Sequence, residues 1–156
     1  MRAHISKNKG AFFAAAAVDI CTKDDLWMWK NPKFFPIIVV DEDVNTIVGI
    51  VLNYIDKDDQ RRPVLLQRQF NHTEELSGVD PAAFCEAAIG VGRMFRQDNN
   101  IESGFIPPQS GWHELSNKDG TLGKYLVGKY VSGKTPMDCS IRIASSKTVE
   151  RIYLVD

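Results

Sequence analysis

The chain has 156 residues, of which 44% are hydrophobic and 25% are charged, and this composition excludes a wholly disordered chain. Lys and Arg number 19 and Asp and Glu 20, so the formal net charge is −1. Non-specific binding of nucleic acid or of an anionic membrane depends on a surplus of positive charge. We therefore expect neither nucleic acid nor membrane as a partner.

The first part of the chain predicts a short strand, two helical segments and a hairpin. Residues 1–6 favour a strand, and the Ala-rich stretch 9–21 favours a helix because Ala loses no side-chain entropy there. Residues 24–29 predict a second, short helical segment. Two β-branched runs, 35–40 and 47–55, are separated by a polar stretch, which is typical of a hairpin.

The best-marked helix in the sequence begins at Asp80-Pro81. Asp is a good N-cap, and Pro fits the first helical position, where its missing N–H costs nothing. The polar run 98–100 predicts the end of this helix, and residues 63–70 predict a strand before it. Gly90 and Gly92 fall inside the helix, and we interpret them as sites of close packing on a sheet.

The last part of the chain predicts more strand than helix. Residues 104–106 favour a strand, 109–120 favour a loop, and 122–131 fit either a short helix or a strand. Two further runs, 139–144 and 149–155, predict an antiparallel hairpin.

Taken together, these elements predict one α+β domain over residues 1–156. We expect a mixed or antiparallel sheet of about six to seven strands, packed by about two to four helices.

The cysteines and histidines point to a reducing compartment and to no metal. Cys21, Cys85 and Cys139 are widely spaced and form no CxxC pair, which argues against a disulfide framework and against a zinc site. Free thiols of this kind favour a cytoplasmic protein. The three histidines lack metal-ligand spacing.

One segment matches a phosphate-loop pattern. Gly128–Thr135 reads GKYVSGKT, which satisfies GxxxxGK[ST]. A true phosphate loop opens a long helix, whose N-terminus binds the phosphates. Here Pro136 follows directly and the next predicted element is a strand, so we interpret the segment as a turn.

A polar loop between the predicted strand 63–70 and the capped helix is a candidate site. It reads Asn71-His72-Thr73-Glu74-Glu75, and a Glu or His placed there can act as a general base if burial tunes its pKa. The alternative is a solvated polar loop.

Aromatic residues give a second candidate. Trp27, Trp29 and Trp112 either pack in the core or line a contact surface. We take His72, Trp112 and His113 as candidate partner or ligand contacts.

The order of elements resembles that of the GNAT acyltransferase superfamily. Residues 37–52, with their acidic turn and Val48-Gly49, look like the second and third strands of that fold. The helix from Pro81 takes the place of the helix beside the pyrophosphate of acyl-CoA, and residues 123–130 take that of the last helix. The family's phosphate motif, Gln/Arg-x-x-Gly-x-Gly/Ala, is not matched in 70–80, which holds one glycine and three carboxylates.

The resemblance implies an N-acyltransferase that uses acyl-CoA. It makes Glu74 or Glu75 the general base, and Tyr125 or Tyr130 the acid that protonates the leaving thiolate. Backbone amides near Gly78 would contact the donor.

Two other functions are open from the sequence. The first is a binding module without catalysis or CoA binding, which recognises a small molecule or a protein through the tryptophans and the 107–113 loop. The second is a self-associating domain that uses the Ala-rich face of 9–21, so a homodimer is one of the options.

Overall fold

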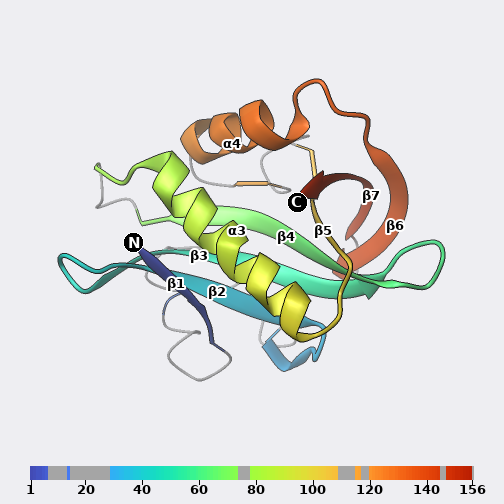
Figure 1. Cartoon of the computed structure of the whole chain (residues 1–156), viewed down its shortest axis with the longest axis horizontal. Coiled ribbons are helices and arrows are strands. Elements are labelled where there is room, and N and C mark those ends of the chain that lie inside the picture. Colours follow the sequence, from blue (N-terminus) through green and yellow to red (C-terminus); the bar gives the residue numbers. More distant parts are fainter. Residues whose placement is uncertain are drawn as a thin grey trace.

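The computed structural model describes residues 1–6, 14, 29–73, 78–108, 115–116, 120–144 and 147–155. These residues form a seven-stranded sheet in the order β1-β2-β3-β4-β5-β7-β6, with helices packed on it, which confirms the predicted α+β class. Figure 1 shows the long helix α3 lying across one face of the sheet, with α4 on the same side.

The strands follow the predicted runs closely. They are β1 (Arg2–Ile5), β2 (Phe34–Asp41), β3 (Thr46–Lys57), β4 (Pro63–His72), β5 (Ser103–Ile106), β6 (Met137–Ala144) and β7 (Lys147–Val155). Both predicted hairpins, β2–β3 and β6–β7, are antiparallel pairs. Neighbouring strands run antiparallel except β4 and β5, which are parallel.

The capped helix is α3, which spans Pro81–Asp98. Its N-cap is Asp80, whose Oδ1 accepts a hydrogen bond from the amide of Ala82 at 3.0 Å. The segment that fitted either helix or strand is helical, with α4 over Gly120–Leu126 continued by a π-helical turn, η2, over Val127–Val131.

The sheet separates two apolar clusters because side chains alternate along its strands. One cluster lies on the α3 face and includes Leu65, Phe70 and Phe84. The other lies on the opposite face and includes Ile50, Leu52 and residues of the β6–β7 hairpin. Trp29 packs against this second cluster, with its ring 5.2 Å from that of Phe34.

The two glycines of α3 have different roles. A Cβ on Gly92 would lie 2.5 Å from Oε1 of Gln67 in β4, so close packing on the sheet explains this glycine as expected. A Cβ on Gly90 would meet nothing within 4 Å. The expectation of close packing is therefore wrong for Gly90.

The segment that matches the phosphate-loop pattern begins in η2 and ends before β6, so a strand follows it and not a helix. Its interpretation as a turn is confirmed for 132–135 only, because 128–131 belong to η2. The helices expected over 9–21 and 24–29 lie almost entirely outside the described residues, as does most of the 109–120 loop. No helix in the described ranges is long and apolar enough to cross a membrane.

Candidate functional site

The parallel strands β4 and β5 pair only over a short distance. Val64, Leu65 and Leu66 pair with β5, which ends at Ile106 because Pro107 and Pro108 have no N–H to continue the ladder. The rest of β4, which we call distal β4, runs on through residues 67–72. On its β5 side, the amide of Phe70 donates to the carbonyl of Leu115 at 2.7 Å.

A β-bulge turns the side chains of distal β4. Leu52 of β3 pairs with Arg68 and Val51 pairs with Phe70, so Gln69 is the extra residue, and its φ is 52°. Phe70 therefore shares the α3 face with Leu65 although the two are five positions apart.

Buried polar atoms gather around distal β4. The side chains of Asn53, Thr73 and Ser116 are 0%, 8% and 6% exposed. Asn53 Oδ1, Thr73 Oγ1 and Ser116 Oγ have no hydrogen-bond partner among the described residues. Asn53 pairs with Gln67 where β4 leaves β5, and the other two flank the far end of distal β4. Unsatisfied buried groups are uncommon and call for a partner such as water or a ligand.

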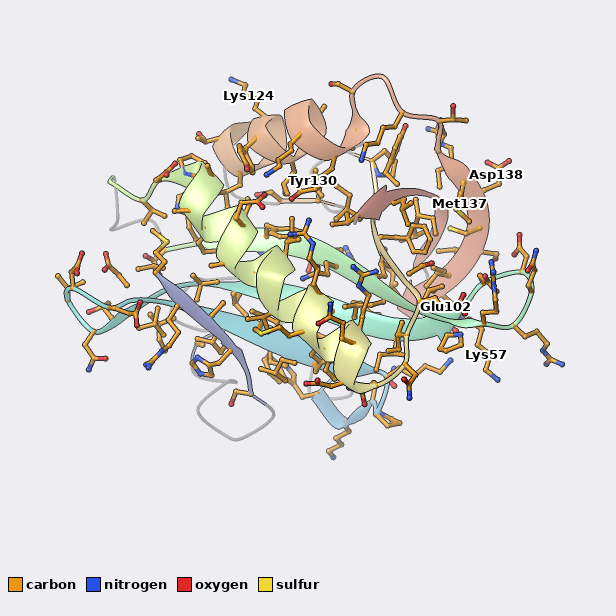
Figure 2. All side chains as sticks on the ribbon, viewed as in Figure 1. Lys57, Glu102, Lys124, Tyr130, Met137 and Asp138 are labelled. Atoms are coloured by element: carbon orange, nitrogen blue, oxygen red, sulfur yellow. The ribbon has the colours of Figure 1, made fainter. Side chains whose placement is uncertain are left out.

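The unit formed by α4 and η2 covers the place where β4 and β5 part. In the sheet, β5 lies between β4 and β7; α4 contacts β4, and η2 contacts β7. Figure 2 shows Tyr130 on the side of this unit that faces the sheet, whereas Lys124 points away from it. Tyr130 is 4% exposed and belongs to the cluster on the α3 face.

Tyr130 takes part in a polar cluster between α3 and the α4–η2 unit. One carboxylate oxygen of Glu86, Oε1, accepts hydrogen bonds from the hydroxyl of Tyr130 at 2.6 Å and from that of Tyr125 at 3.0 Å. The same oxygen forms an ion pair with Nζ of Lys129 at 3.0 Å. We call these four residues the Glu86 cluster.

The electrostatics of the Glu86 cluster favour an ionised carboxylate beside protonated phenols. Burial alone would raise the pKa of Glu86, but hydrogen bonds from Tyr130, Lys129 and Tyr125 and the charge of Lys129 hold that pKa below its ordinary value. Burial and the hydrogen bond to Glu86 raise the pKa of Tyr130 to about 12. The pKa of Tyr125 is raised by burial and by Glu86, against the opposing effect of Lys129.

The N-terminus of α3 already holds a carboxylate. Asp80 accepts from the amide of Ala82, and its carbonyl accepts from Phe84 at 3.0 Å, while Pro81 has no N–H to offer. A negative side chain at this end satisfies the helix dipole and opposes the approach of a phosphate.

The two predicted acid candidates, Tyr125 and Tyr130, are brought together on Glu86. Gly78 lies in an exposed turn before α3, and a Cβ there would meet nothing within 4 Å. His72 is half-buried at the end of β4, with Nδ1 2.7 Å from the carbonyl of Thr73.

The remaining predicted site residues lie outside the described part of the chain. These are Glu74, Glu75, Trp112 and His113, together with Trp27 and Cys21. Among the described residues, no group of three or more His, Cys, Asp or Glu side chains could hold a metal ion. Burial raises the pKa of the Cys85 thiol, and burial also raises that of Cys139, to about 11.

Sequence reasoning missed Glu86 and the contact between Phe70 and Leu115. Glu86 is one of several charged residues on α3, and nothing in its neighbourhood along the chain marks it out. The available signal was the pair Tyr125 and Tyr130, whose hydroxyls share Glu86 where the helix that carries them ends in a π-turn.

Comparison with known proteins supports the fold but not a specific activity. No protein-family model matches the sequence, and no curated protein matches it. Among solved structures, an aminoglycoside acetyltransferase from an uncultured soil metagenomic sample, in complex with trehalose, superposes with a TM-score of 0.55 at 15% identity, over 90% of this chain and 95% of that chain.

Two further solved structures share the fold. The N-acyl amino acid synthase FeeM from uncultured soil microbes has a TM-score of 0.55 at 10% identity, over 99% of this chain and 92% of that chain. A Trypanosoma brucei acetyltransferase has a TM-score of 0.50 at 8% identity, over 89% and 99% of the two chains. The chain therefore has a GNAT-like fold, which confirms the architecture that the order of elements implied.

Proposed function

We propose that the protein is an N-acyltransferase that moves an acyl group from a thioester donor to an amine. The observation that carries this proposal is the parting of β4 from β5 beneath the α4–η2 unit, with Tyr130 on the inner side of that unit. The solved structures that share the fold are described as acyltransferases, which supports the same class of reaction.

The reaction is an acyl transfer between nitrogen and sulfur. The amine attacks the thioester carbonyl, an N–C bond forms and the C–S bond breaks, and one proton passes from nitrogen to sulfur. In the proposal, Glu74 or Glu75 takes the proton from the amine, and Tyr130 gives one to the leaving thiolate. We prefer Tyr130 to Tyr125 because it is the more deeply buried of the two.

The chain fits the thioester arm of an acyl-CoA better than its phosphates. Distal β4 runs on past the end of β5, where its Phe70 amide bonds to the carbonyl of Leu115, and Thr73 and Ser116 carry buried hydroxyls beside it that have no partner among the described residues. The Asp80 carboxylate opposes a pyrophosphate at the first turn of α3. We therefore propose that the thioester arm lies along distal β4 and that any nucleotide lies away from the first turn of α3.

Thermal unfolding with added ligand tests donor binding directly. A ligand at one hundred times its Kd that binds only the native state adds about 2.7 kcal/mol, or about 5–10 °C in Tm for a chain of this size. We expect acetyl-CoA and longer acyl-CoAs to raise the Tm and ATP to leave it unchanged. Absence of any shift with every thioester at millimolar concentration would contradict the proposal.

A matched pair of variants then tests the chemistry. Tyr130→Phe removes only the hydroxyl, so we expect an unchanged Tm shift with donor and a fall in kcat of about 10²-fold or more, measured by mass spectrometry of acylated amines. Tyr153→Phe makes the same change in β7 and is the control. Equal activity of the two variants would remove Tyr130 from the reaction.

A further inference from the structure

The convergence of two phenols on one oxygen of Glu86 is the best-defined polar geometry near the proposed site. The hydroxyls of Tyr130 and Tyr125 both donate to Oε1, at 2.6 and 3.0 Å. Lys129 binds the same oxygen and also donates to the Tyr125 hydroxyl at 3.3 Å. Each phenol therefore directs its proton at α3.

The π-helical turn makes this convergence feasible. In an α-helix with 3.6 residues per turn, side chains five positions apart point about 140° away from each other. In η2 the amide of Ser132 bonds to the carbonyl of Val127, five residues earlier, at 2.8 Å. This wider turn brings Tyr125 and Tyr130 to the same side, and such turns are frequent at functional sites.

Charged groups from each neighbouring described element act on the Tyr130 phenol. Glu86 and Arg93 face it from α3, and Lys129 faces it from η2, with its Nζ 5.5 Å from the centre of the ring. Lys134, from the turn after η2, lies with its Nζ 5.6 Å from the same ring. Burial, followed by the hydrogen bond to Glu86 and its charge, raises the pKa of Tyr130 to about 12, against the opposing charges of Lys129 and Arg93.

We propose that Glu86 is a positioning residue for acyl transfer: its Oε1 holds the Tyr130 phenol in place through the 2.6 Å hydrogen bond until the hydroxyl turns to the leaving thiolate. This role rests on the proposed function. An aliphatic amine loses its proton and becomes nucleophilic near pH 10, which is also the ordinary pKa of a tyrosine. Glu86 therefore holds the pKa of Tyr130 above that of the amine, so that a neutral amine and a protonated phenol coexist between the two pKa values.

The first test is a tyrosinate titration of the free protein, followed by near-ultraviolet absorbance. Glu86→Gln keeps an oxygen that accepts hydrogen bonds but removes the charge. We expect Tyr130 to ionise about one pH unit or more lower in this variant. Adding Tyr130→Phe to the wild type and to Glu86→Gln identifies which part of the absorbance change comes from Tyr130. Glu102→Gln is the control, because the side chain of Glu102 is 76% exposed and lies before β5. Identical titrations of the Glu86→Gln and Glu102→Gln variants would overturn the role of Glu86.

The second test is the pH dependence of kcat with an acyl-CoA and an aliphatic amine. We expect Glu86→Gln to shift the alkaline limb of the profile to lower pH, by as many pH units as the tyrosinate titration of Tyr130 shifts. The KM for the donor should stay unchanged. We expect Glu86→Ala, which also loses the hydrogen-bond acceptor, to lower kcat at least about tenfold at every pH. A profile of Glu86→Gln that coincides with that of wild type would overturn the positioning role alone. Absence of acylation with every donor would overturn the proposed function, and this role with it, whatever the titration shows.

Discussion

Gly92 of α3 lies directly against the side chain of Gln67 in β4, and this contact sets how closely the helix approaches the sheet. A Cβ on Gly92 would come within 2.5 to 2.9 Å of three atoms of the Gln67 amide. That amide is itself buried and donates from Nε2 to the carbonyl of Ala88 at 3.1 Å, so it cannot move aside without breaking a buried hydrogen bond.

The two glycines of α3 therefore respond in opposite ways to the same substitution. We expect Gly92→Ala to lower the free energy of unfolding by about 1–3 kcal/mol through overpacking against Gln67. Gly90→Ala meets open space and gains helix propensity, so it raises the same quantity by up to about 1 kcal/mol. Urea denaturation of both variants measures the difference. Equal effects of the two changes would contradict the packing described for Gly92.

Removal of the buried hydroxyls near distal β4 separates stability from binding. Thr73→Val and Ser116→Ala each delete a hydroxyl that has no partner among the described residues. We expect the free protein to keep its stability or to gain about 1 kcal/mol, because an unsatisfied buried group is costly. If these hydroxyls bind the thioester arm, the same variants lose donor affinity by about tenfold, measured by calorimetry. A loss of stability without a loss of affinity would remove them from the donor site.

Asp80 allows the charge at the first turn of α3 to be changed without loss of the cap. Asp80→Asn keeps an oxygen that accepts from Ala82, whereas Asp80→Ala removes it and costs about 1 kcal/mol of stability. If donor phosphates pass near this turn, Asp80→Asn tightens acyl-CoA binding, and the gain shrinks as salt is added. If they lie elsewhere, as we propose, the affinity of Asp80→Asn equals that of wild type.

Glu86 also links stability to pH. Its pKa is lowered on folding from an ordinary value of 4.5, so its contribution is complete above pH 4.5 and is lost as the pH falls through the lowered value. We expect Glu86→Gln to cost about 1–2 kcal/mol near pH 7 and much less at strongly acidic pH. Urea denaturation at the two pH values gives the comparison. A cost that does not depend on pH would mean that the charge of Glu86 is not stabilising.

The strands and α3 were predictable because their signals are local. The hairpins follow from β-branched runs and polar turns, and α3 follows from the Asp80-Pro81 cap. The site was harder to predict from the sequence, because it depends on contacts between segments far apart along the chain. Glu86 and Tyr130 are 44 residues apart, and Phe70 meets Leu115 beyond the end of β5 at Ile106.

The helical form of 122–131 illustrates why such a segment is ambiguous. Its valines and tyrosines favour a strand, its leucines and lysines favour a helix, and its two glycines favour neither. Tertiary contacts select the helix. Leu122 and Leu126 are buried against the sheet, and Tyr125 and Tyr130 bind Glu86.

The β6–β7 hairpin is joined to the rest of the sheet by few strand pairs. Among the described strands, β6 pairs only with β7, and β7 joins the rest of the sheet through three residue pairs with β5. Two long side chains reinforce this short seam: Arg96 donates to the carbonyl of Val155 at 3.2 Å, and Lys134 to that of Leu154 at 3.4 Å. The β6–β7 hairpin therefore depends on apolar burial more than on strand pairing for its attachment to the sheet, because Ile141, Ile143, Val149 and Ile152 share one cluster with Ile50 and Leu52.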